Sequence, residues 1–394
     1  MKASRDKNRT ATAATKTGAQ QLFALETWRG LDWSLVGMIL AIKASLFLFA
    51  VHAYYVFADR AIPTFREWLE IWNRWDAPHY LDLARDGYVA TGEQRLWIVF
   101  YPLYPWLARA FAFVVGDDHL IGAFIVSTLA SVVAGLLLQR LARLDDSDAV
   151  ARSAVVFLFI FPTSYFLHIG YTESLFVALA VGCFLAARTE RWWLAGVLGA
   201  LAGLTRINGS ILIPALAVEA LHQYRTTRRL NLQWLWIALA PLGFAAYLAL
   251  NKYVTGDAFA FTEIASQHWF KTLSSPWHGI TEVYNSVWWR TPSDSQMVGM
   301  QELFFILLGL MCTVWCWRAL RPSYAVWMTL NWLLWTSTSF VLSAPRYTVI
   351  LFPIYILFAR LAAARPLWGV VITVWSLLLL SLFVSRFVQG LWAF

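Results

Sequence analysis

The feature that most constrains this chain is a series of apolar stretches that begins at Leu31 and recurs to the C-terminus. About 20 residues of α-helix rise roughly 30 Å, which is the thickness of the hydrocarbon core of a bilayer. Only 14% of the residues are charged, whereas soluble domains carry roughly 25%. The sequence therefore predicts an all-α polytopic membrane protein. It excludes a soluble enzyme, a disordered chain and a secreted disulfide scaffold.

The apolar runs predict about 11 membrane-spanning or half-spanning helices. Two long non-spanning regions, at about 58–118 and 252–300, form the predicted outer loops, and a run at 96–116 is broken by Pro102 and Pro105. Because proline ends or kinks helices, we expect this run to lie at the membrane interface. Residues 1–27 are predicted to be a disordered cytoplasmic tail and 28–394 a single transmembrane domain. The predicted spans are 31–57, 119–139, 150–169, 172–187, 192–205, 207–221, 232–251, 301–317, 323–342, 347–364 and 366–388.

The net charge of +8 predicts the orientation of these spans. Arginines gather in five short connections, which the positive-inside rule places in the cytoplasm together with the N-terminus. The excess charge then reports orientation, so we expect no nucleic-acid partner. Successive spans alternate in direction across the membrane only if 192–221 crosses twice, as two half-helices that meet near Arg206 and Asn208. The five connections are 140–149, 188–191, 222–231, 318–322 and 360–365.

Ionisable residues in the first outer loop are the first candidates for a functional site. Helical spacing places Asp76, His79 and Tyr80 on one helix face, and Gly87 is a typical C-terminal stop. The carboxylate of Asp76 could act in catalysis. It could equally cap the helix that continues through Pro78, and His79 could be a packed interfacial histidine.

Two aromatic–proline units follow, Tyr101-Pro102 and Tyr104-Pro105. They predict either a platform for an acceptor or lipid beside the site, or a simple aromatic anchor at the membrane interface.

Three further charged residues fall at predicted outer ends of spans: Glu173, Arg206 and Arg346. An ionisable residue at membrane depth is costly and is usually retained for a function. Guanidinium groups bind phosphate through paired, charge-assisted hydrogen bonds. The alternative is structural, with Glu173 capping a helix and the arginines forming ion pairs with Glu173 or with acids of the first loop.

Five segments in order resemble the PIG-V type, the GPI mannosyltransferase 2 family of GT-C membrane glycosyltransferases. The resemblance runs from about residue 30 to 365. Compact outer loops are compatible with a prokaryotic relative, which leaves the acceptor open. The matching segments are Trp75-Asp76-x-x-His79 to Tyr88, Phe100 to Pro105, Tyr171 to Ser174, Leu204 to Gly209, and Pro345-Arg346-Tyr347.

The resemblance implies a polyprenyl- or dolichyl-phosphate mannose donor, a lipid or glycolipid acceptor, and inverting transfer on the non-cytoplasmic face of the bilayer. Asp76 maps to the acid near the reacting centre, where it could take the acceptor proton. Arg206 and Arg346 could stabilise the phosphate that leaves. His79 and Glu173 would orient Asp76 or bind sugar hydroxyls. The predicted substrate-binding residues are Trp75, Tyr80, Tyr101, Tyr104, Tyr171, Asn208 and Tyr347.

No cofactor is assigned, although a divalent metal near Asp76 stays open, as does a small membrane subunit. The membrane would be a bacterial plasma membrane, or the ER membrane in a eukaryote. One alternative function is a GT-C enzyme that transfers another sugar, such as aminoarabinose, to lipid or protein. The other is a non-catalytic transporter or flippase, which should show related halves and polar groups at the midplane. The sequence shows neither feature.

Overall fold

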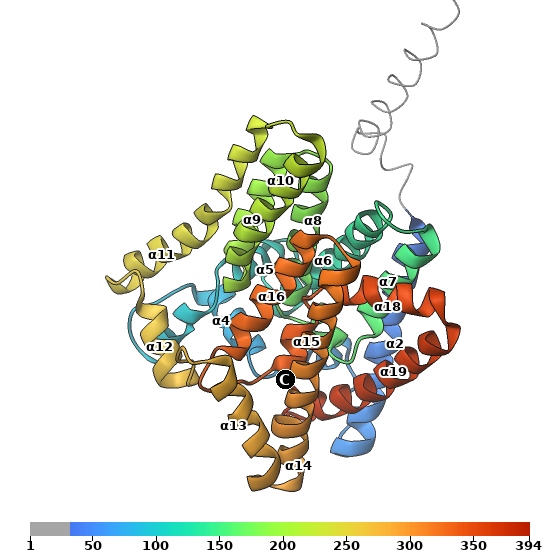
Figure 1. Cartoon of the computed structure of the whole chain (residues 1–394). Coiled ribbons are helices and arrows are strands. Elements are labelled where there is room, and N and C mark those ends of the chain that lie inside the picture. Colours follow the sequence, from blue (N-terminus) through green and yellow to red (C-terminus); the bar gives the residue numbers. More distant parts are fainter. Residues whose placement is uncertain (1–31) are drawn as a thin grey trace, which may run out of the picture.

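The computed structural model describes residues 32–394, and its regular elements are helices (Figure 1). Within that range the β-type pairing is limited to an isolated bridge between Leu273 and Thr338. The predicted all-α architecture is therefore confirmed. The predicted tail at 1–27 lies outside the described residues.

The long apolar runs form helices that begin at side-chain caps. Asp32 and Asp118 each accept a hydrogen bond from a backbone N–H in the first turn, which starts α2 and α6. By length and composition, five helical segments in residues 32–394 can cross a membrane, or six if a bent pair counts as one. They are α2 (Trp33–Ala58), α6 (His119–Ala142), η5–α11 (Leu232–Thr255), α14–η6–α15 (Pro292–Ala319) and α19 (Pro366–Val388).

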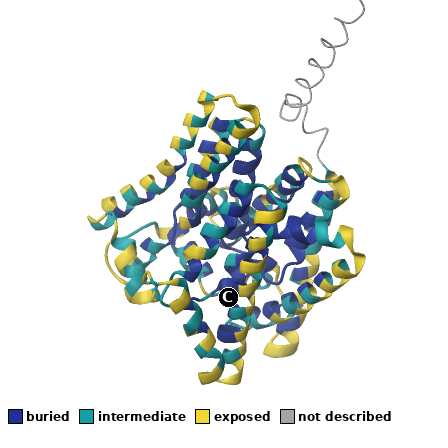
Figure 2. Cartoon of the chain, in the orientation of Figure 1, coloured by how far each residue is buried: buried dark blue, intermediate teal, exposed yellow. Residues whose placement is uncertain are grey.

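The outer faces of these segments are exposed (Figure 2), and the segments are apolar in composition. On α19, for example, Leu367, Val370 and Leu378 are each at least 60% exposed. Such a surface is unfavourable in water but suits lipid chains. The chain is therefore an integral membrane protein.

Shorter helices fill the centre of the bundle, and α8 is buried along almost its whole length. Alanine, glycine and serine on α6 let neighbouring helices approach closely; at Gly122 a Cβ atom would lie 2.5 Å from the Ala108 carbonyl oxygen of α5. The central helices are α7 (Asp148–Ile160), α8 (Glu173–Arg188), α9 (Trp192–Gly203), α10 (Leu212–Thr227), α16 (Pro322–Thr336) and α18 (Pro353–Ala364).

Several apolar runs are broken at the ends that carry the candidate site. The run 192–221 separates into α9 and α10 around η4 (Ile207–Ile211), as the orientation argument predicts. The run 150–169 was expected to be continuous, but α7 ends at Ile160, because Phe161 precedes Pro162 and residues before proline disfavour the helical conformation. The run 347–364 is likewise divided, into α17 (Ala344–Thr348) and α18.

The two predicted outer loops contain short helices. In the first, η2 and α5 meet at an angle of 114° close to Pro102, which confirms the predicted break. In the second, the helical segment that continues into α15 starts at Pro292, earlier than the predicted limit at residue 300. The loop helices are α3 (Phe65–Glu70), α4 (Ala77–Asp86), η2 (Glu93–Val99), α5 (Leu103–Val114), α12 (Ala260–Trp269) and α13 (Pro276–Trp289); a short turn, η3 (Ser164–Leu167), precedes α8.

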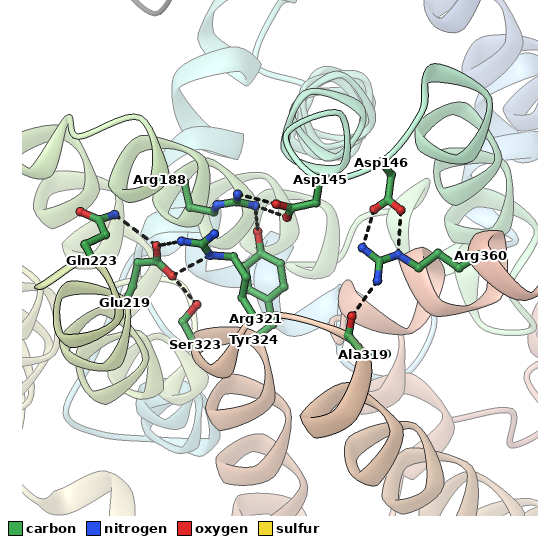
Figure 3. A network of polar contacts seen from close by, with 10 residues as sticks. All are labelled: Asp145, Asp146, Arg188, Glu219, Gln223, Ala319, Arg321, Ser323, Tyr324 and Arg360. Carbon is green, nitrogen blue, oxygen red and sulfur yellow. Dashed lines mark hydrogen bonds and ion pairs between the residues drawn. The ribbon is translucent and has the colours of Figure 1, made fainter. Parts of the chain in front are cut away.

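Ion pairs join the central helices at the C-terminal end of α8 (Figure 3). Arg188 forms an ion pair with Asp145, Arg360 holds both carboxylate oxygens of Asp146, and Arg321 pairs with the fully buried Glu219. We call this set the distal network, because α8 separates it from Glu173. Its members are Asp145, Asp146, Arg188, Glu219, Gln223, Ala319, Arg321, Ser323, Tyr324 and Arg360.

Candidate active site

A cavity of about 580 Å³ opens among the helix breaks. Its walls come from α4, the η2–α5 connection, η4, α12, the α16–α17 connection and the segment after α19. The lining is mostly aromatic and aliphatic, with a few charged groups. Apolar cavities with a few convergent polar groups are typical of small-molecule sites.

Asp76 lies at the start of α4 and lines this cavity. Its side chain makes no capping hydrogen bond to the helix, so the capping alternative does not account for the carboxylate. One oxygen, Oδ2, accepts a hydrogen bond from Nη1 of Arg346 at 2.5 Å. The other, Oδ1, accepts none from residues 32–394. One carboxylate oxygen is thus available to a bound molecule.

Glu173 joins the two arginines. Its Oε1 atom accepts from Nη1 of Arg206 at 2.5 Å and from Nε of Arg346 at 2.6 Å. The Glu173 side chain is fully buried, whereas the side chains of Arg206 and Arg346 are 11% and 8% exposed. We call Asp76, Glu173, Arg206 and Arg346 the cavity network. The sequence offers such ion pairs as a structural alternative for these residues, and the structure contains them. Both arginines also line the cavity.

Local chain geometry sets the positions of the two arginines. Gly209, which follows Arg206 in η4, packs directly against the backbone of α9. A Cβ atom at Gly209 would lie 2.3 Å from the Gly203 nitrogen. Arg346 is carried by α17, whose first amides, at Ser343 and Ala344, each donate to the buried carboxylate of Glu302 at 2.6 Å. Ser343 itself has φ of 72°, a left-handed conformation.

The structure brings most of the predicted site residues together. Glu173, Tyr104 and Tyr171 lie behind the cavity wall, because all three side chains are fully buried and none lines the cavity. Glu173 therefore reaches the cavity only through the arginines. The predicted residues that line the cavity are Trp75, Asp76, His79, Tyr80, Tyr101, Arg206, Asn208, Arg346 and Tyr347.

His79 packs flat against Trp97, with ring centroids 3.7 Å apart. Burial lowers the pKa of His79 from its ordinary value of 6.5, and the nearby carboxylates of Asp76 and Asp82 only partly offset this effect. The imidazole is therefore neutral near pH 7, which suits hydrogen bonding to hydroxyl groups better than binding of a phosphate.

Several cavity residues escaped the sequence prediction. Lys271 follows α12, and its ammonium donates to the Phe340 carbonyl oxygen at 2.9 Å. Trp392 comes from the last residues of the chain and packs edge-on against Trp75, with centroids 5.0 Å apart. No residue spacing in the sequence links the segments that carry Lys271 and Trp392 to the motifs of the predicted site. Glu302 could have been found from the sequence, because, like Glu173, it is an acid at the end of an apolar run.

The arrangement combines two chemical capacities in one cavity. A carboxylate with a free oxygen can accept a proton from a bound hydroxyl. Two guanidinium groups in the same cavity, one of them paired with Asp76, can hold an anionic group such as a phosphate. In residues 32–394 no cluster of three histidine, cysteine or acidic side chains is arranged to hold a metal ion.

The chain is similar in sequence to known mannosyltransferases. Residues 101–250 match the family described as dolichyl-phosphate-mannose-protein mannosyltransferase. GPI mannosyltransferase 2 of Schizosaccharomyces pombe is 27% identical over 213 residues, which cover 50% of this chain and 45% of that protein. GPI alpha-1,6-mannosyltransferase 2 of Rattus norvegicus is 29% identical over 149 residues, or 35% and 30% of the two chains.

The crystal structure of ArnT from Cupriavidus metallidurans bound to undecaprenyl phosphate has a similar fold, with a TM-score of 0.53. The similarity covers 85% of this chain and 61% of ArnT at 15% identity, so it bears on the fold alone. In sequence the chain is similar to the PIG-V-type GPI mannosyltransferases, and in fold it is similar to ArnT. This confirms the family resemblance and the GT-C fold. The aligned parts span less than half the length of these curated GPI mannosyltransferase relatives.

Proposed function

We propose that this PIG-V-like chain is an inverting glycosyltransferase, specifically a mannosyltransferase. It would transfer a sugar from a polyprenyl- or dolichyl-phosphate donor to a lipid or glycolipid acceptor on the non-cytoplasmic face of its membrane. The observation that carries the proposal is the placement of Asp76 beside Arg206 and Arg346 in one cavity. The names of the relatives, which are mannosyltransferases, support the choice of sugar.

The proposed reaction is a single displacement. The acceptor hydroxyl attacks C1 of the sugar, its proton passes to the free Oδ1 of Asp76, and the bond from C1 to the phosphate oxygen breaks. The lipid phosphate leaves with one more negative charge than it carried in the donor. The N–H groups of Arg206 and Arg346 that face the cavity would stabilise this charge. Attack from the side opposite the phosphate inverts the configuration at C1.

Glu173 has a positioning role in this proposal. It holds both guanidinium groups through Oε1 and so fixes the phosphate site. His79, Tyr101 and Asn208 line the same cavity and would bind sugar or acceptor hydroxyls. The Tyr101 hydroxyl is buried without a hydrogen-bond partner in residues 32–394, which suits that role.

A transfer assay with radiolabelled polyprenyl-phosphate mannose and candidate lipid acceptors tests the proposal. Asp76→Asn should lower turnover by about 10²–10⁴-fold, the usual contribution of a general base. Asp82→Asn is the matched control, because Asp82 lies on the same helix, pairs with Arg85 and does not line the cavity. Full turnover by the Asp76→Asn variant would exclude Asp76 as the base.

A second candidate is the same reaction with another sugar. The fold shared with ArnT, whose structure holds undecaprenyl phosphate, favours a polyprenyl-phosphate carrier without specifying mannose. Competition between labelled mannose donor and other polyprenyl-phosphate sugars distinguishes the two. Movement of intact donor across vesicles with no transfer would instead indicate a flippase.

A further inference from the structure

The backbone just before Asp76 adopts an unfavourable conformation. Trp75 has φ of 57°, in the left-handed region that bulky side chains rarely occupy. Such conformations persist only where the surrounding structure holds them, and they cluster at functional sites. The position of the Asp76 carboxylate therefore depends on whatever fixes this turn.

The hydroxyl group of Tyr171 fixes the turn from both sides. It donates to the Arg74 carbonyl oxygen at 2.8 Å and accepts from the Asp76 N–H at 3.2 Å. The two peptide groups that flank Trp75 are thus tied to one oxygen atom. Tyr171 lies between η3 and α8, about 95 residues along the chain from the turn, so the contact joins separate parts of the bundle.

The ring of Tyr171 also supports the partner of Asp76. The guanidinium carbon of Arg346 lies 4.6 Å from the ring centroid, within the range of a cation–π interaction. Arg346 in turn donates to Oδ2 of Asp76. A single fully buried side chain therefore contacts both the backbone of Asp76 and the cation paired with its carboxylate.

We infer that Tyr171 is a positioning residue for the Asp76 carboxylate. Its hydroxyl orients the carboxylate through the backbone of the turn, and its ring holds the guanidinium group of Arg346 in place. This differs from the substrate-binding role that the sequence predicts for Tyr171, because the side chain does not line the cavity. The inference rests on the proposed function, in which Asp76 is the base.

Two substitutions separate the hydroxyl from the ring. Tyr171→Phe removes one oxygen and keeps the ring under Arg346, so kcat should fall about 10–100-fold while KM for the donor is unchanged, since small displacements of a reacting group can cost a factor of that size. Tyr171→Leu also removes the ring and should raise the donor KM in addition. The kcat of each variant is calculated per molecule of folded, monodisperse enzyme.

Tyr324→Phe is the matched control. Its hydroxyl is also buried and accepts from Nη1 of Arg188 at 3.1 Å in the distal network, at the other end of α8 from Glu173. A purely structural role for Tyr171 would lower the yield of folded protein and leave kcat per folded molecule as in wild type. That result for Tyr171→Phe, or an equal loss of kcat in Tyr324→Phe, would overturn the inference.

The Asp76→Asn variant, assayed in parallel, keeps the two proposals distinct. If Asp76→Asn is inactive and Tyr171→Phe has wild-type kcat, the positioning role alone fails. If Asp76→Asn is fully active, the proposed base fails and the positioning role fails with it.

Discussion

The cavity network and the distal network are built from the same residue types at opposite ends of α8, yet they differ in how completely their hydrogen bonds are satisfied. In the distal network Glu219 accepts from Arg321, Ser323 and Gln223, so both of its oxygens are occupied. Arg188 and Arg360 each hold both oxygens of an aspartate.

The cavity network is left incomplete. Both arginines converge on a single oxygen of Glu173, and its buried Oε2 has no partner in residues 32–394. Oδ1 of Asp76 is also free, and both arginines line the cavity with N–H groups that are not hydrogen-bonded to residues 32–394. A satisfied network stabilises the fold, whereas an unsatisfied one has capacity for a ligand. This difference indicates that the cavity network, and not the distal network, is the candidate active site.

The same substitution in each network should give the largest contrast. Arg346→Lys should lower transfer by about 10²–10³-fold, because an ammonium cannot replace a planar group that donates to Asp76 and Glu173 along two edges. Arg360→Lys should leave turnover within about twofold of wild type, as is usual away from a site. The transfer assay measures both. Equal losses in the two variants would remove the functional distinction between the networks.

Removing the buried acid of each network should separate stability from activity. Glu173→Gln removes the buried carboxylate paired with Arg206 and Arg346, and Glu219→Gln removes the buried carboxylate paired with Arg321. Breaking a buried ion pair typically costs about 3–5 kcal/mol. Thermal unfolding in detergent should therefore show a lower midpoint for both variants. Only Glu173→Gln should also lower transfer per folded molecule. A comparable loss of specific activity in Glu219→Gln would contradict this separation.

Lys271 offers a smaller test of the cavity as an anion site. It lines the cavity and donates to a backbone carbonyl rather than to a carboxylate. Lys271→Met should raise the KM of a phosphate-bearing donor about tenfold, the equivalent of one charge-assisted hydrogen bond, with kcat little changed. The exposed Lys252, on α11 and outside the cavity lining, provides the control substitution Lys252→Met. An unchanged donor KM in Lys271→Met would place the phosphate away from α12.

The smallest expected effect is the pH dependence of stability at His79. Because burial lowers its pKa below 6.5, the unfolded chain takes up a proton before the folded chain does as the pH falls. The contribution of neutral His79 to stability is thus present above pH 6.5 and lost below it. His79→Phe keeps an aromatic ring against Trp97 but cannot titrate. Its unfolding midpoint should fall less than that of wild type between pH 7.5 and 5.5, and parallel curves would contradict the assignment.

The sequence predicts the helical frame well because bilayer thickness restricts where apolar runs can lie. It also selects Arg206 and Arg346, since an isolated charge at the end of an apolar run is costly and is seldom kept without a function. Asp76 is selected differently, by its helical spacing in the first outer loop and by the family resemblance. Whether Tyr171 faces the cavity depends on side-chain direction at a helix break, which no periodicity encodes. The contributions of Lys271 and Trp392 depend on where loops fold back, and chain order alone cannot specify that.

The end of the chain has a practical consequence for handling this protein. Trp392 and Phe394 form part of the cavity wall, and Phe394 is only 2% exposed. A purification tag or reporter inserted between α19 and Phe394 would displace the aromatic side chains that close this wall. Low activity in such a fusion would then report damage at the junction rather than a defect in Asp76 or the arginines.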